Sequence, residues 1–579
     1  DSLIVTGTTT LVGTTNLDVV DIDGAANFAA DVTFADGADL ITASAGTSNL
    51  RLGVNAGNSI ASGGNNNTLI GDEAGTALTT GDSNVAVGKD ALRTEDAHGK
   101  NVAVGMNALE DLNAGADGEN VAVGNEAGAE MTLGIKNVLV GSQAGDALTH
   151  ADFNVAVGMG SLTSDTLGSK SVAIGTFALL AQNFTTATDS HNTAVGNDAG
   201  KAVTTGVKNT LIGGLAGDAL TDADFNVAMG YAALTSDTLG SKSVAIGRTA
   251  LSAQNFTTAT DTYNVAVGYD AGAAVTTGTL NTLIGGQAGD ALTVGNNNVV
   301  VGYAALGSDT KGDRNVAIGG SALATQNFST STDAYNVAIG FAAGLAVTTG
   351  NQNTLIGGLA GDALTVGYNN VTLGYLALSA DTKGNNSVAI GRGALETQNF
   401  TTATDANNTA VGNNAGTATT NGVNNTFIGA GAGVSLTTGD KNTMIGDRAG
   451  DVTTSGGGNI VIGTTCDTNA AATSNSIVMG EAAVGVGANN FTFGNGGTDS
   501  NIAFGATSIT APSDQRYKEE IADATAGLSF IKDLRPVTFK WKKEKDVPSD
   551  HLSYVEGSDK RIMNDYTNHG FIAQEVKTA

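Results

Sequence analysis

Residues 154–175 read NVAVGMGSLTSDTLGSKSVAIG, and the five-residue boxes at its two ends, NVAVG and SVAIG, decide the fold. Boxes of this kind recur along the chain from Asn67 to Asn501. Most follow the previous box by a 17-residue step, and four follow it by a 21-residue step, those at Asn192, Asn264, Asn336 and Asn408. A fixed short period over most of the chain is typical of a solenoid or fibrous array rather than of separate globular domains.

A longer, 72-residue period lies above the short one. Boxes of this period, each reached by three short steps and one long step, begin at Ser171, Ser243, Asn315 and Ser387. The 21-residue steps contain segments such as FALLAQNFTTATDSH. We expect these segments to be longer loops repeated on one side of a rod, where binding is easiest to place.

Each box reads as a short β-strand. In NVAVG the two valines project to one face and the alanine to the other, because side chains alternate along a strand. We expect the valine face to line a core and the small-residue face to pack against another layer or chain. Asn before the strand and Gly after it suit turns and positive φ. The linking segment, for example AGTALTTG at 74–81, predicts a second short strand at ALT.

Composition favours thin stacked layers over one deep core. The chain holds 81 glycines and only 5% aromatic residues, and 41% of it is apolar in a regular pattern, unlike a disordered chain. All three prolines lie near the end, at Pro512, Pro536 and Pro548. The predicted fold class is mostly β: an elongated, repetitive β-solenoid or β-roll fibre.

Charge excludes one class of partner. Residues 513–579 are nearly neutral at −1, whereas residues 1–512 carry −28. An acidic body gains nothing from a polyanion, so we expect no nucleic-acid partner. No run of about 18 apolar residues could cross a bilayer, and we expect no membrane insertion. Cys466 is the only cysteine, which excludes an intrachain disulfide.

The repeated polar residues have two readings each. The asparagines are either turn caps and stacked ladders or a glycan-binding row. The scattered aspartates are either solvated surface acids or calcium ligands, although the nonapeptide GGxGxDxUx of calcium β-rolls is absent. We assign no metal and no cofactor.

The last part of the chain differs from the repeats. In DATAGLSFIKDL, residues Leu528, Ile531 and Leu534 are spaced by three, which predicts an amphipathic helix. In RPVTFKW, residues Val537, Phe539 and Trp541 alternate, which predicts a half-buried strand. The two together indicate a small α+β domain.

Two resemblances bear on the body of the chain. The boxes of residues 49–505 resemble the head repeats of trimeric autotransporter adhesins, and LIVTGTTTLVGTTNLDVVDIDG looks like the Thr/Gly-rich shaft of phage tail fibres. Either resemblance implies a homotrimeric, extracellular, elongated object. We therefore expect a shaft segment at 1–48, a repeat fibre at 49–509 and a C-terminally incomplete terminal domain at 510–579.

The terminal domain carries the most specific resemblance. The motifs SDQRYKEEI, GLSFIKDLRPVTFKWK and HGFIAQEV resemble the C-terminal intramolecular chaperone of phage tailspikes, tail fibres and endosialidases. That family trimerises, assists fibre assembly and then removes itself by proteolysis. The resemblance implies Ser513 as nucleophile and Lys518 as its base, with cleavage between Pro512 and Ser513. The alternative is that Ser513 caps a helix and Lys518 is solvated.

The expected function is structural: a trimeric phage tail fibre in the virion that attaches to the host, with a host-surface glycan or protein as receptor. At most, the terminal domain is a single-turnover serine peptidase, and the body is not an enzyme. The alternatives are a bacterial trimeric surface adhesin and a rod carrying a polysaccharide-degrading activity. Against the last, every Asp/Glu cluster that we identify recurs with the period or lies in the tail.

Overall fold

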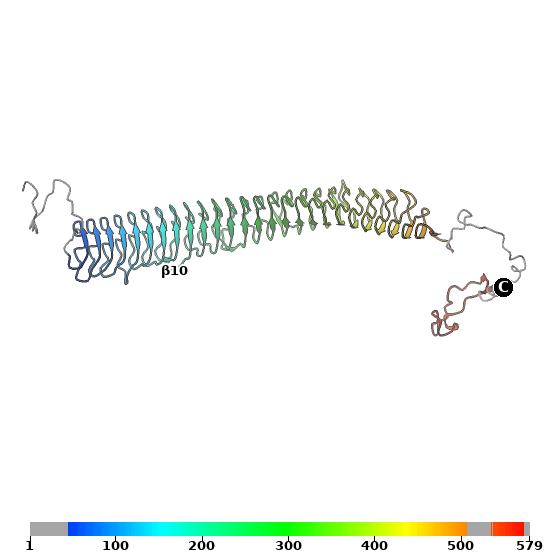
Figure 1. Cartoon of the computed structure of the whole chain (residues 1–579), viewed down its shortest axis with the longest axis horizontal. Coiled ribbons are helices and arrows are strands. Elements are labelled where there is room, and N and C mark those ends of the chain that lie inside the picture. Colours follow the sequence, from blue (N-terminus) through cyan, green and yellow to red (C-terminus); the bar gives the residue numbers. More distant parts are fainter. Residues whose placement is uncertain (1–43, 507–533, 535, 573–579) are drawn as a thin grey trace, which may run out of the picture. The chain divides into compact units, whose positions relative to one another are not determined.

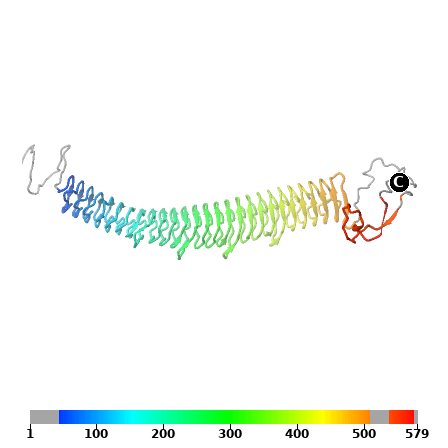
Figure 2. The ribbon, with the colours of Figure 1, turned by 90° about the horizontal axis from the view of Figure 1, so that it is seen from below.

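The computed structural model describes residues 44–506, 534 and 536–572. These residues divide into two units, of which the first ends at Gly497 apart from Ala503–Gly505. The first unit is a long rod of stacked turns, gently curved in the second view (Figures 1 and 2). Most of the predicted shaft segment, residues 1–43, lies outside the described part. Within the described ranges, no helix has the length and apolar character needed to cross a membrane.

One short strand per turn builds the rod. Strand β3 (Val85–Val87) pairs in parallel with β4 (Val102–Val104), and Ala86 lies opposite Ala103. The same in-register pairing joins each turn to the next, which gives about 26 turns. A parallel sheet made from consecutive turns of one chain is a β-solenoid, so the predicted fold class is confirmed.

The strands of the rod are short and have the following bounds: β1 (Leu50–Leu52), β2 (Thr68–Ile70), β3 (Val85–Val87), β4 (Val102–Val104), β5 (Val121–Val123), β6 (Val138–Val140), β7 (Val155–Val157), β9 (Val172–Ile174), β11 (Thr193–Val195), β12 (Thr210–Ile212), β13 (Val227–Met229), β15 (Val244–Ile246), β17 (Val265–Val267), β18 (Thr282–Ile284), β19 (Val299–Val301), β21 (Val316–Ile318), β23 (Val337–Ile339), β24 (Thr354–Ile356), β25 (Val371–Leu373), β27 (Val388–Ile390), β29 (Thr409–Val411), β30 (Thr426–Ile428), β31 (Thr443–Ile445), β32 (Ile460–Ile462), β33 (Ile477–Gly480) and β34 (Asn490–Gly494). The next strand in sequence is β35 (Ser500–Ala503).

From β2 to β34, the middle of each strand, not the outer pair, points into the core. Ala86 is fully buried, while Val85 and Val87 on either side of it are half-buried. The prediction that the valine face lines the core is therefore wrong. Leucines of the same turn or of neighbouring turns fill the space beside the small strand residue. Leu92, in the turn of Ala86, is also fully buried. In the turn of Ala266, a Cβ built on Gly272 would lie 2.6 Å from the Leu283 Cδ1 and 3.0 Å from the Leu251 Cδ2 of the neighbouring turns.

Leucine and glycine exchange places in other turns. Where the strand supplies Leu69, the position six residues later is Gly75, and a Cβ built there would lie 2.9 Å from the Leu69 Cδ2. Gly75 and Leu92 occupy equivalent positions, and both have φ near +55°, at 57° and 52°. A leucine in this conformation is strained. Its complete burial, worth about 1.5–3 kcal/mol, offsets that strain.

The linking segment is a turn and not a second strand. At Ala77–Thr79 the chain bends, so the prediction of a strand at ALT is wrong. Successive turns are nevertheless hydrogen-bonded here, since the Thr149 N–H donates to the Thr166 carbonyl at 2.9 Å. The leucine of this segment, for example Leu148, is fully buried and belongs to the core.

The glycine that ends each box is required by a close approach of backbones. Gly88 has φ of 140°, and a Cβ on it would lie 2.3 Å from the carbonyl oxygen of Gly105 in the next turn. The predicted use of Gly at a positive φ is confirmed.

The 21-residue steps form longer loops that project on one side of the rod (Figure 2). Each loop is held by a parallel pair of two-residue strands, β8 (Gly168–Ser169) with β10 (Thr188–Asp189) in the first. The other pairs are β14 (Gly240–Ser241) with β16 (Thr260–Asp261), β20 (Gly312–Asp313) with β22 (Thr332–Asp333), and β26 (Gly384–Asn385) with β28 (Thr404–Asp405).

The second unit contains a small antiparallel pair, β36 (Val537–Phe539) with β37 (Asn568–Gly570), and a single 3-10 turn, η2 (Glu544–Asp546). Val537, Phe539 and Trp541 are half-buried while Thr538 and Lys540 are exposed, so the predicted alternation is confirmed. The Phe539 and Trp541 rings meet edge to face, with centroids 5.3 Å apart. The predicted helix over DATAGLSFIKDL lies outside the described residues, except for Leu534.

Candidate functional site

The outer face of the sheet is an apolar strip that follows the rod. It consists of the first and third residues of each strand, which are valine, isoleucine or threonine at most turns. Several of these side chains are more than a third exposed, among them Val123, Val138, Ile174, Ile284, Val299 and Ile460. Large exposed apolar patches mark interaction sites, so a strip of partly exposed β-branched residues over this many turns is a candidate interface. We call this surface the valine face.

The asparagines that open the boxes form a buried ladder. The Asn154 backbone N–H donates to the Asn137 Oδ1 at 2.9 Å, and its Nδ2 donates to the Gly168 carbonyl at 2.9 Å. Residues of this ladder are 0 to 6% exposed. The ladder reading is confirmed, and the glycan-binding row is wrong because these amides have no access to solvent.

At each longer loop a buried polar network joins the ladder, which continues through the third loop, where the Asn336 backbone N–H donates to the Asn315 Oδ1 at 3.3 Å. Asp309 is fully buried, and its Oδ2 accepts a hydrogen bond from the Gln326 Nε2 at 2.6 Å. The Asn336 Nδ2 donates to the Gln326 Oε1 at 2.8 Å, while the Asp309 Oδ1 accepts backbone N–H groups from Gly312 and Phe328 at 3.0 and 3.3 Å. The network fixes both ends of the loop. Equivalent Asp–Gln pairs hold the other three loops: Asp165 with Gln182, Asp237 with Gln254, and Asp381 with Gln398. Burial raises the pKa of Asp381.

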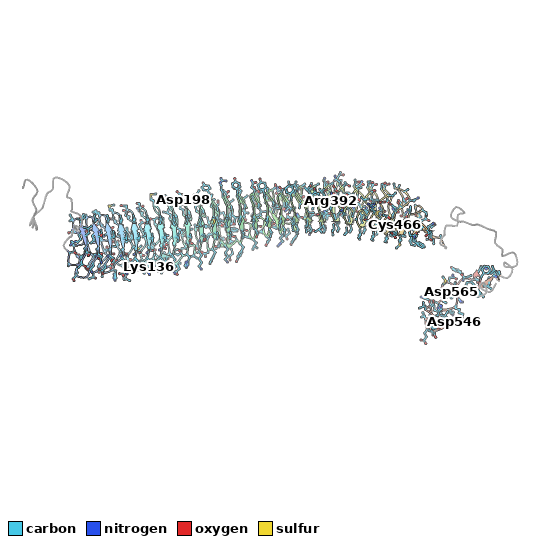
Figure 3. All side chains as sticks on the ribbon, in the orientation of Figure 1. Lys136, Asp198, Arg392, Cys466, Asp546 and Asp565 are labelled. Carbon is cyan, nitrogen blue, oxygen red and sulfur yellow. The ribbon has the colours of Figure 1, made fainter. Side chains whose placement is uncertain are left out.

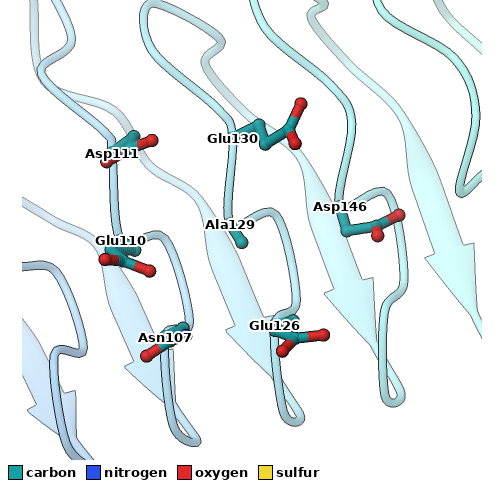
Figure 4. A pocket seen from close by; sticks show the side chains of 7 residues that line it. All are labelled: Asn107, Glu110, Asp111, Glu126, Ala129, Glu130 and Asp146. Atoms are coloured by element: carbon teal, nitrogen blue, oxygen red, sulfur yellow. The ribbon is translucent and has the colours of Figure 1, made fainter.

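One acidic cluster does not recur with the period, contrary to the sequence prediction. A pocket of about 320 Å³ is lined by side chains of three successive turns, Asn107, Glu110, Asp111, Glu126, Ala129, Glu130 and Asp146 (Figure 4). Sequence reasoning missed it because its members come from separate turns and meet only when the turns stack. Most of these acids have partners within the rod. Arg93 pairs with Glu110 at 2.6 Å, the Gln143 Nε2 donates to Glu126 at 3.0 Å, and Thr163 donates to Asp146.

A second acidic group contains a histidine. Ligand atoms of Glu95, Asp96 and His98 lie within 4.8 Å of one another. Glu95 is fully buried, its two oxygens accept the backbone N–H groups of His98 and Ala114 at 3.1 and 3.2 Å, and burial raises its pKa. These hydrogen bonds explain the burial of Glu95 by a structural role, since its carboxylate joins two successive turns.

In the second unit, basic side chains hold the segment between β36 and β37 together through ion pairs and a hydrogen bond. Lys543 and Lys545 each contact Asp559 at 2.6 Å, and these two ammonium groups lower the pKa of Asp559 to about 2. The Arg561 guanidinium donates to the Trp541 carbonyl at 2.6 Å. His551 accepts the Ser553 N–H at 3.2 Å, and we assign it no catalytic role.

The predicted catalytic residues lie outside the described part of the chain. Pro512, Ser513 and Lys518 fall between Ala506 and Leu534, so their mutual geometry stays a prediction.

Comparison with known proteins gives one family. Residues 513–579 match the family model described as chaperone of endosialidase. The match begins at Ser513. No curated protein matches the chain, and no solved structure does.

Proposed function

We propose that this chain is the rod of a homotrimeric phage tail fibre that attaches to the host. Its C-terminal chaperone directs assembly and then removes itself. The observation that carries the proposal is the family match over residues 513–579, which follows directly on a β-solenoid of about 26 turns. A single solenoid turn cannot bury its apolar side chains alone, so several neighbouring turns must form together before any of them is stable. An attached assembly domain would help the first turns to form.

The valine face supports the homotrimer. It leaves apolar surface exposed along the rod, and a second and third copy of the chain would present the same face with the same 17-residue period. Symmetric association would then cover the face on every subunit. The resemblance of the repeats to trimeric adhesin heads agrees with this arrangement.

Self-removal would proceed by acyl transfer within the chain. Lys518 takes the proton of the Ser513 hydroxyl, and the Oγ attacks the Pro512 carbonyl carbon. The amide becomes an ester as the Ser513 nitrogen gains a proton, and water then hydrolyses the ester. A lysine acts as a base only when burial lowers its pKa, which would make cleavage depend on correct assembly.

The test is the site of cleavage. The expressed chain should divide into a rod ending at Pro512 and a fragment whose first residue, by N-terminal sequencing, is Ser513. Ser513→Ala and Lys518→Ala should each leave the chain intact and still trimeric, whereas Lys577→Ala should be processed normally. A fragment that starts elsewhere, or normal processing of Ser513→Ala, would remove the catalytic assignment.

A further inference from the structure

Five exposed aromatic side chains stand in one column along the rod. Each follows the glycine that ends a box, so each occupies the same corner of its turn. They are 50 to 68% exposed, with the largest values at Tyr303 and Phe341. We call this set the aromatic ladder: Tyr231, Tyr269, Tyr303, Phe341 and Tyr375.

The rings recur at every second turn. They follow strands β13, β17, β19, β23 and β25, and one strand of the parallel sheet lies between each pair of neighbours. Because adjacent strands are about 4.8 Å apart, successive rings are about 9.6 Å apart along the rod. The in-register pairing of every turn keeps this spacing constant.

From Tyr269 onward, the turns between the rings carry glycine in the same column, and the rings rest against it. A Cβ built on Gly286 would lie 3.6 Å from the Tyr303 Cδ2, and one on Gly320 would lie 3.6 Å from the Phe341 Cδ2. The same contact recurs at Gly358, 3.5 Å from Tyr375. Each of these rings therefore leans over the preceding turn, and no side chain in the column separates it from the ring before. Tyrosine and phenylalanine side chains have few rotatable bonds, so a ligand that stacks on such a ring costs little side-chain entropy.

The aromatic residues on the other edge of the rod differ in one respect. These residues stand directly before a box, at the position that Lys136 holds in its turn. Figure 3 shows Lys136 on one edge of the rod and Asp198, which follows a strand, on the opposite edge. Here the ring faces are covered by the chain's own cations: Lys208 lies 4.9 Å from the Phe225 centroid, and Lys242 lies 5.1 Å from that of Tyr263. Arg314 covers Tyr335 at 5.6 Å. In the ladder such a cation contact is recorded, among the described residues, only at Tyr269, with Arg248 of the turn before it.

From this geometry we propose that the aromatic ladder binds a neutral, extended β-1,4-linked glycan. In such a chain each sugar is turned over relative to the last, so the same apolar ring face recurs at every second sugar. This repeat distance is close to the distance between successive rings of the aromatic ladder. Tyrosine offers an apolar ring and a hydroxyl together, which suits a ligand with C–H faces and hydroxyl rims. The acidic rod disfavours polyanionic glycans. This inference rests on the proposed function, because it names the class of receptor.

A subunit contact does not account for the ladder equally well. The valine face extends over the turns from β2 to β33, whereas the rings are confined to the turns from β13 to β25. An interface that joins whole rods has no need of rings in the middle turns only. A globular protein partner would not present five contacts at one constant interval.

The experiment measures binding of cellohexaose to the full chain by titration calorimetry, with maltohexaose, its α-1,4-linked isomer, as the control ligand. Six sugars would contact three successive rings of the aromatic ladder, so the test variant is Tyr303→Ala/Phe341→Ala/Tyr375→Ala. We expect wild type to bind cellohexaose and not maltohexaose, and the variant to bind at least about tenfold more weakly. Tyr303→Phe/Tyr375→Phe keeps the rings and should retain binding.

The matched control variant is Phe225→Ala/Tyr263→Ala/Tyr335→Ala, which removes three rings from the other edge and should bind like wild type. Circular dichroism and native mass should be unchanged in all variants. Equal binding of the two glycans, wild-type binding by the ladder variant, or loss of binding in the control would overturn the inference. A fall in native mass of the ladder variant would make the ladder a subunit contact instead. Wild type that trimerises and cleaves but does not bind cellohexaose would refute this inference alone.

Discussion

A single buried carboxyl, Asp467, makes the last turns of the rod sensitive to pH. Its side chain is 5% exposed and accepts hydrogen bonds from the Val452 and Thr468 backbone N–H groups at 2.6 and 2.8 Å. Burial, followed by a hydrogen bond with the Asp451 side chain, raises the pKa of Asp467 to about 7. The folded rod therefore holds this proton more tightly than an unfolded chain, in which the pKa is 3.8.

The sign of the effect follows from that difference. The stabilising contribution is fully present below pH 3.8 and is lost as the pH rises towards about 7. Amides of residues 451–485 should exchange hydrogen with larger protection factors at pH 5 than at pH 8. Asp467→Asn imitates the protonated form and should remove this dependence. Asp447→Asn, at an exposed position of the preceding turn, should retain it. Equal protection of wild type at both pH values would contradict the assignment.

Which side chain of a box points inward could not be predicted from the sequence. In a three-residue strand such as Val265–Val267 both faces are apolar, so alternation alone does not choose between them. The choice depends on volume within the stack of turns: Leu69 packs beside Gly75, Ala86 is paired with Leu92, and in the turn of Ala266 leucines of the neighbouring turns reach Gly272. That packing is visible in the sequence only when each box is compared with the residue six positions later and with the same positions of the neighbouring turns.

At the scale of elements, the longer loops depend on one buried glutamine each. Gln326 is fully buried and bridges Asp309 to Asn336. Gln326→Leu would leave the Asp309 Oδ2 without that donor, and an unsatisfied buried acceptor costs about 1–3 kcal/mol. We expect the loop to open locally, with faster proteolysis at residues 329–331, while the far-ultraviolet spectrum of the rod stays unchanged.

The control for that prediction is Gln352→Leu, the same change at an exposed position. Leucine is tolerated in that place, because Leu280 holds the equivalent position with φ of 61°. Proteolysis of Gln352→Leu should match wild type. Unchanged proteolysis of Gln326→Leu would show that the loop is held by its backbone pairing alone.

The period, the short strand in each box, the Asn ladder and the extra length of the loops could be predicted, because each repeats in sequence. The Asp–Gln network was missed although its signal was present, since Asp165, Asp237, Asp309 and Asp381 recur with the 72-residue period. The ALT segment was misread because threonine favours strands, yet the adjacent glycine turn leaves too few residues to extend.

At the scale of the whole molecule, substitutions on the valine face and in the core should have opposite effects, although the residues are neighbours in one strand. Val265→Asp with Val267→Asp places charges on the outer face, so the chain should keep its β spectrum. If the valine face joins the subunits of the proposed homotrimer, the native mass should fall from three chains to one. Ala266→Asp buries an unpaired charge in the core, at a cost of several kcal/mol, and should unfold the adjoining turns.

Native mass spectrometry with circular dichroism distinguishes the two outcomes. A trimeric mass for the double variant would exclude the valine face as the subunit interface. A folded, stable Ala266→Asp variant would contradict the orientation of the strands.

The 72-residue block makes the rod adjustable in reach. Each block is four turns, so adding or deleting one changes the length by about 19 Å and leaves every remaining turn with an equivalent neighbour. Four is an even number, and the every-second-turn placement of rings in the aromatic ladder therefore keeps its parity across such an insertion or deletion. A change of a single 17-residue turn within the ladder would instead break that alternation at the point of change. The rod can therefore change its length in whole 72-residue blocks while the rings stay at every second turn.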